Sequence, residues 1–101
     1  MSYNMTAADL TSEWSEVIGD FTTIHLLQVR GNSALQGDGP AAEVMVASTT
    51  PTAADHGVEL YVGNILTASV LENLGDGGPL YARAVGRGVP GMKVQLTMVN
   101  E

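Results

Sequence analysis

Apolar and polar residues alternate in several short segments of the chain, a pattern typical of half-buried β-strands. In segment 42–49, Val44 and Val46 fall on one face, and Glu43 and Met45 fall on the other. Strands with related patterns are predicted at 58–62, 80–85 and 92–100. These segments therefore predict a protein built mainly from β-strands.

Three other segments have less regular patterns. Segment 21–31, FTTIHLLQVRG, is rich in β-branched and large apolar residues and predicts a central strand. Segment 65–74, ILTASVLENL, fits either a strand or a short helical turn. Residues 1–12 are small and polar and favour an extended arm, although Leu10, Trp14 and Val17 also recur at helical spacing.

Loops rich in glycine and proline separate the predicted strands. They lie at 31–40, 51–57, 75–79 and 86–91. Some six or seven short strands joined in this way are typical of an antiparallel β-sandwich or small barrel, either immunoglobulin-like or jelly-roll-like. We therefore expect an all-β fold with an N-terminal arm at 1–12 and a single β domain at 13–101.

The composition narrows the classes of function. The chain has 101 residues, no cysteine and a net charge of −7, so we expect one domain with a thin core, held by packing or by a partner subunit. The basic residues are scattered along the chain: Arg30, Arg83, Arg87 and Lys93. This argues against nucleic-acid binding.

The chain has no apolar run of membrane-spanning length and no basic residue before Arg30, so we expect synthesis in the cytoplasm and no membrane partner.

The stretch GRGVPG, Gly86 to Gly91, matches the G-x-G-x-x-G pattern of dinucleotide-binding proteins. That pattern functions between a strand and a helix, whereas the residues after Gly91 alternate like a strand. Pro90 also lacks the backbone N–H that would face a phosphate. We predict a hairpin between the last two strands, no cofactor, and contact of Arg87 with a neighbouring subunit.

The titratable residues do not form a recognisable catalytic or metal-binding set. His25 lies within a predicted strand, and His56 follows Asp55 in a predicted turn. Neighbouring side chains usually point apart, and two histidines with scattered carboxylates do not make a zinc site. We therefore predict no catalytic and no metal-binding residues, with a small hydrolase using His56 and Asp55 as an alternative.

The few aromatic residues are widely spaced. Trp14, Phe21, Tyr61 and Tyr81 are expected to anchor the core or a subunit interface. The alternative is a carbohydrate- or surface-binding β module in which Trp14, Tyr61 or Tyr81 is exposed.

The order of several segments carries a family resemblance. SEWSEV precedes DFTT and a strand ending LLQVRG, and then come AEVMVASTTPTAADHGVEL and GPLYARAVG. From Glu13 to Val99 this arrangement resembles small all-β structural proteins of tailed bacteriophage virions. The resemblance implies a non-enzymatic capsid decoration or cement protein, or else a head-fibre, neck or tail subunit.

The resemblance also implies a location and partners. We expect a virion protein that binds the major capsid protein or other virion proteins and forms homo-oligomers, for example trimers. The residues that we expect at interfaces are Trp14, Arg30, Tyr81, Arg83 and Arg87.

Overall fold

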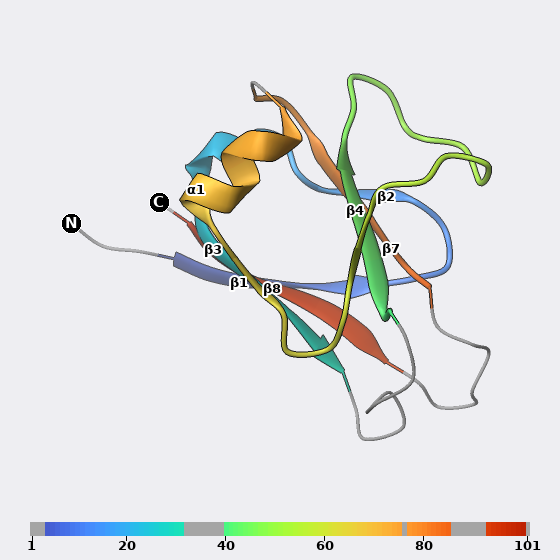
Figure 1. Ribbon diagram of the computed structural model, residues 1–101, viewed down its shortest axis with the longest axis horizontal. Coiled ribbons are helices and arrows are strands. Elements are labelled where there is room, and N and C mark those ends of the chain that lie inside the picture. The colour runs from blue at the N-terminus through green and yellow to red at the C-terminus, as the bar shows by residue number, and fades with distance from the viewer. Residues whose placement is uncertain (1–3, 32–39, 76, 86–92, 101) are drawn as a thin grey trace.

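Two four-stranded antiparallel sheets pack together in the computed structural model, which describes residues 4–31, 40–75, 77–85 and 93–100 (Figure 1). Sheet A has the order β1 (Asn4–Leu10), β8 (Val94–Asn100), β3 (Ile24–Gly31) and β6 (Ile65–Thr67). Sheet B has the order β2 (Ser15–Ile18), β7 (Leu80–Ala84), β4 (Ala42–Val46) and β5 (Val58–Leu60). This arrangement confirms the predicted all-β sandwich.

The core lies between the two sheets. Leu27, Val29 and Leu96 enter it from sheet A, and Val44 and Leu80 enter it from sheet B, all fully buried. The alternation in segment 92–100 is confirmed, since the even-numbered apolar positions of β8 face this core. Strand β3 is central as predicted, with β8 on one side and β6 on the other.

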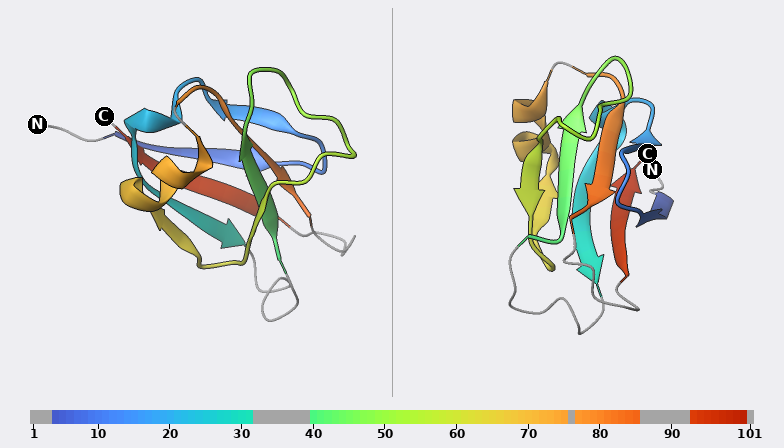
Figure 2. Two further views of the ribbon diagram at one scale, coloured as in Figure 1. Left: turned by 45° about the horizontal axis from the view of Figure 1, so that its top comes forward. Right: turned by 90° about the vertical axis from the view of Figure 1, so that its right-hand side faces the viewer.

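One end of the sandwich is closed by short helices. The 3-10 helix η1 (Phe21–Thr23) contacts α1 (Ala68–Leu71), which continues into the 3-10 helix η3 (Glu72–Leu74) (Figure 2). The sequence of segment 65–74 predicts either a strand or a short helical turn, and the segment contains both. Its first part forms strand β6, and its second part forms the helical turns α1 and η3. Across the described ranges, no helix is long and apolar enough to cross a membrane.

The expectation of a loose arm is wrong for residues 4–10, which form edge strand β1 and pair with β8 along their whole length. Backbone hydrogen bonds drive this pairing, so an edge strand needs few apolar side chains. Only Ala8 and Leu10 of β1 pack against the core. The helical alternative is also wrong for this segment, because β1 and β2 are both strands.

The predicted hairpin between the last two strands is wrong. Strand β7 belongs to sheet B and β8 belongs to sheet A, so these strands do not pair with each other. The connection crosses between the sheets, and the glycine motif within it lies outside the described residues. The element after the motif is a strand, as expected, and not the helix that a dinucleotide site requires.

Candidate functional site

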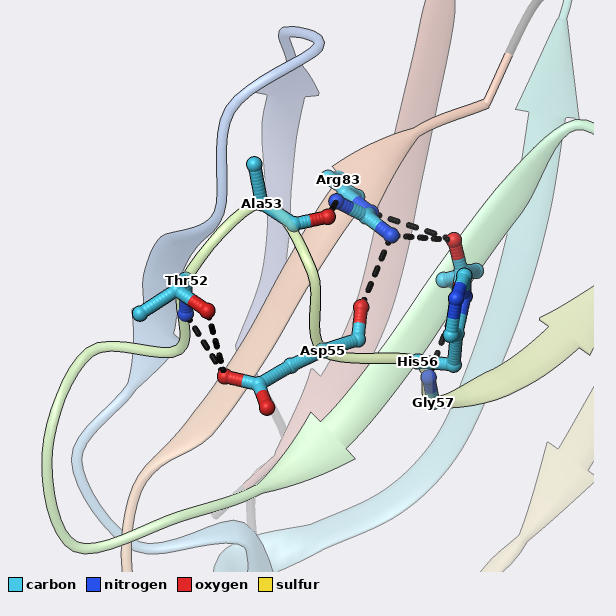
Figure 3. A network of polar contacts seen from close by, with 7 residues as sticks. Thr52, Ala53, Asp55, His56, Gly57 and Arg83 are labelled. Atoms are coloured by element: carbon cyan, nitrogen blue, oxygen red, sulfur yellow. Dashed lines mark hydrogen bonds and ion pairs between the residues drawn. The ribbon is translucent and has the colours of Figure 1, made fainter.

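The most developed polar cluster lies on the outer face of sheet B. Glu43 of β4 and Arg83 of β7 are directly paired in the sheet, and their neighbours Val44 and Ala82 face the core. Because side chains alternate along a strand, Glu43 and Arg83 point away from the core. The connection between β4 and β5 nevertheless folds over them (Figure 3), and they are only 4% and 9% exposed. We call Glu43, Arg83 and the backbone at 53–57 that binds them the Arg83 clamp.

Arg83 fastens the connection to the sheet. Its Nε and Nη2 donate hydrogen bonds to Glu43 Oε1 at 3.1 and 2.8 Å. Nη1 donates to the Ala53 carbonyl at 3.1 Å, and Nη2 also donates to the Asp55 carbonyl at 2.9 Å (Figure 3). The guanidinium carbon lies 4.6 Å from the centre of the Trp14 ring, within cation–π range. The arginine thus joins β4, β7, the residues before β2 and the 53–57 segment.

Glu43 completes the clamp from the other side. Its Oε2 accepts a hydrogen bond from the Gly57 backbone N–H at 2.8 Å, and His56 Nδ1 lies 3.8 Å away. Burial acts to raise the pKa of the Glu43 carboxyl, but the Gly57 N–H and Arg83 outweigh it and hold the pKa below its ordinary value. Glu43 is therefore a charged partner for Arg83 at neutral pH.

Asp55 and His56 have separate surroundings. Asp55 Oδ2 accepts hydrogen bonds from the Thr52 N–H and hydroxyl at 2.7 and 3.2 Å, which makes it a turn residue (Figure 3). The His56 side chain is 81% exposed, and its Nδ1 lies 3.8 Å from Glu43 Oε2, beyond hydrogen-bond distance. No hydroxyl is hydrogen-bonded to His56 within the described ranges, so this geometry does not support the hydrolase alternative.

Open hollows flank the clamp. One of about 310 Å³ is lined by Ser12, Glu13, Trp14, Thr50, Pro51, Ala53 and Arg83. Another of about 430 Å³ is lined by Pro40, Glu43, His56, Gly57, Glu59 and Val85. In the part of the chain that the structure describes, no group of three acidic, histidine or cysteine residues is placed to hold a metal ion. Among the lining residues, Arg83 bonds to Glu43 and to the Ala53 carbonyl, and Glu43 bonds to the Gly57 N–H, which indicates a structural role for the clamp.

Three of the five residues expected at interfaces lie together, but they are buried on sheet B. Trp14 and Tyr81 are only 7% and 6% exposed, and they lie with Arg83 in or beside the clamp. Arg30 is exposed on sheet A, and Arg87 lies outside the described residues. The alternative of a carbohydrate- or surface-binding β module needs Trp14, Tyr61 or Tyr81 to be exposed. Of these three rings, only Tyr61, 52% exposed, is open to solvent.

Sequence reasoning missed the role of Glu43, which the alternation placed on a polar face. The available signal was one charged residue in each of two apolar segments, AEVMV and LYARA. Neighbouring strands could place the two opposite charges side by side, but their pairing and register were not visible in the pattern. A charge within an apolar strand is a reason to look for a buried partner.

Gly57→Ala is expected to lower the free energy of unfolding by about 1–3 kcal/mol. A Cβ at this position would overlap the Val44 carbonyl oxygen, so the backbone that donates to Glu43 would have to move. Urea denaturation measures the change. Gly19→Ala is the matched control, because a Cβ there meets no atom within 4 Å, and we expect stability within about 0.5 kcal/mol of wild type. Equal effects of the two substitutions would contradict the close contact at Gly57.

Comparisons with protein-family models, with curated proteins and with solved structures find no match to this chain.

Proposed function

We propose that this protein is a non-enzymatic structural component of a bacteriophage particle, a capsid decoration or cement protein. Its partner in this role is the major capsid protein in the assembled coat. Two observations support the proposal. The first is the resemblance of residues 13–99 to virion proteins, and the second is the free edge of β1, which could dock a strand of another protein.

The free edge of β1 is the observation that carries the proposal. The strand is seven residues long and is paired on one side only, with β8, among the described residues. It contains no lysine and no proline, the residues with which natural edge strands commonly block further pairing. Its single charged residue, Asp9, accepts a hydrogen bond from Gln95 Nε2 of the neighbouring strand at 2.6 Å. The edge is therefore suited to adding a strand from another protein.

Strand addition provides affinity through backbone hydrogen bonds and needs no catalytic side chain. If the added strand comes from the coat and is presented only in the assembled lattice, binding favours that state over separated subunits. The decoration protein then stabilises the capsid in proportion to its affinity and concentration. This is the mechanism that we propose.

The test uses expanded capsids of the phage that encodes the protein, purified without it. We expect wild-type protein to bind at a fixed number of copies per capsid and to raise the capsid's melting temperature. Absence of both binding and stabilisation would contradict a decoration role. Binding to isolated necks, tails or head fibres instead would favour the alternative virion subunits.

A pair of proline substitutions, Thr6→Pro and Ala7→Pro, tests whether the β1 edge is the docking site. Consecutive N–H groups of a strand point to opposite sides, so one of these prolines removes a donor toward β8 and the other a donor on the free edge. We expect one variant to melt at a lower temperature. The other should keep its stability but lose capsid occupancy. Retained occupancy in both variants would exclude this edge as the docking site.

A further inference from the structure

The outer face of sheet A differs from that of sheet B in being open to solvent. On sheet B, the 47–57 segment covers Glu43 and Arg83 of the two central strands and is held there by Arg83. On sheet A, the outward side chains are exposed or half-exposed, with Met5 at 74% and Ile65 at 52%. We call this surface the sheet A face.

A row of polar side chains crosses one end of the sheet A face. Asp9 of β1 pairs with Gln95 of β8, which pairs in turn with Arg30 of β3. The acidic and basic residues of this row thus lie two strands apart, on either side of β8. Arg30, Gly31, Lys93 and Gln95 line a shallow hollow of about 250 Å³ beside the row.

An apolar row crosses the other end of the same face. Met5 of β1 pairs with Val99 of β8, and Val99 pairs with Leu26 of β3. Between the two rows lie the uncharged residues Ala7 and Thr97. Apolar side chains placed side by side on an open sheet gain stability when a second surface covers them.

The charge on this face is unusual for the protein. The chain carries eleven acidic residues and a net charge of −7, so two copies repel each other at most orientations. Asp9 is the only acidic residue on the three paired rows, where Arg30 balances it. Lys93 lies at the end of the face, where its long stem lets the ammonium group remain in solvent. The sheet A face is therefore a surface through which two acidic copies can approach.

We propose that two copies of this chain pair through their sheet A faces, about a two-fold axis that runs parallel to β8. The two-fold rotation leaves each row at the same position along β8. It places β1 of one copy over β3 of the other. It places Asp9 of one copy over Arg30 of the other, and Arg30 over Asp9. Met5 is placed over Leu26 of the second copy by the same operation, and Val99 lies over its own equivalent.

The face is thus complementary to itself in both charge and hydrophobicity, which an isologous interface requires. Packing of two sheets face to face with nearly aligned strands is a common arrangement. A two-fold interface uses the same surface on both copies, so the assembly closes at two copies. The pairing goes beyond the proposed capsid role and does not depend on it.

The experiment measures molar mass by light scattering and sedimentation, with purified protein and no capsid present, over a range of concentrations. A chain of 10.5 kDa is expected to reach twice that mass as concentration rises. Asp9→Arg alone places two arginines opposite each other, and Arg30→Asp alone places two aspartates opposite each other. We expect each to weaken pairing by at least about tenfold, and the double exchange Asp9→Arg/Arg30→Asp to restore it.

Two further variants control for charge and for folding. Glu16→Arg makes the same change in charge as Asp9→Arg but lies on sheet B, and it should leave pairing unchanged. Met5→Lys changes a side chain that is already 74% exposed, so the fold should persist while pairing weakens.

A single-chain mass at all concentrations would overturn the proposal, as would a trimeric mass. So would pairing that survives both single exchanges, or folded single variants whose double exchange does not restore pairing. Failure of capsid binding leaves this result intact, since no capsid enters the measurement.

Discussion

Replacing Arg83 with methionine is expected to lower the free energy of unfolding by about 3–5 kcal/mol, the usual cost of breaking a buried ion pair from one side. The variant leaves the Glu43 carboxylate, only 4% exposed, without its cationic partner. It also removes the donors to the Ala53 and Asp55 carbonyls, so the segment over sheet B loses its attachment. Urea denaturation followed by tryptophan fluorescence measures the change, because Trp14 stacks on the guanidinium.

The double variant Arg83→Met/Glu43→Gln separates two effects: the unpaired buried charge on Glu43, and the loss of the hydrogen bonds that Arg83 donates. A glutamine removes the buried charge and still offers an oxygen to the Gly57 N–H. We expect the double variant to be more stable than Arg83→Met alone, although less stable than wild type because the two carbonyls remain unpaired. A loss below about 1 kcal/mol in the single variant would contradict a buried clamp, since that is the range of surface ion pairs.

Leu27→Ala is expected to lower the free energy of unfolding by about 2–5 kcal/mol. Leu27 lies on the central strand β3, has no exposed surface and packs between the sheets. Removing its side chain loses apolar burial and leaves a cavity that a rigid sheet cannot easily close. Chemical denaturation measures this loss too.

Leu26→Ala is the matched control for Leu27→Ala. The two leucines are consecutive, but Leu26 faces outward beside Val99 on sheet A and is half-buried. At a concentration low enough to keep copies apart, we expect a loss below about 1 kcal/mol. Equal losses for the two variants would show that the faces of β3 are assigned incorrectly.

The orientation of these leucines illustrates where the sequence pattern was insufficient. A simple alternation that starts at the buried residue Ile24 would place Leu26 inside. The register of β3 against β8 shifts between Ile24 and Leu26, so that Leu27 and Val29 point into the core instead. A bulge of this kind depends on the neighbouring strand, and the segment HLLQ carries no sign of it.

The candidate site was predictable only in part. Sequence reasoning selected Trp14, Tyr81 and Arg83 as residues of interest, and the structure places all three in or beside one buried cluster on sheet B. It did not find Glu43, and it assigned the cluster to a surface between subunits. The reason is that burial of a polar face depends on which loop folds over it, and 40 positions separate Glu43 from Arg83 along the chain.

The sequence by itself determined that this protein is all-β, either a sandwich or a small barrel, because alternation in segments such as 92–100 predicts strands with one buried and one open face. Only the tertiary structure decided which strands share a sheet. In the structure, residues 4–10 form strand β1 of sheet A, and β7 and β8 belong to different sheets. Glu43 and Arg83 are buried together as an ion pair. Strand pairing is made by backbone groups that every residue carries, so side-chain patterns reveal the faces of a strand but not its neighbours.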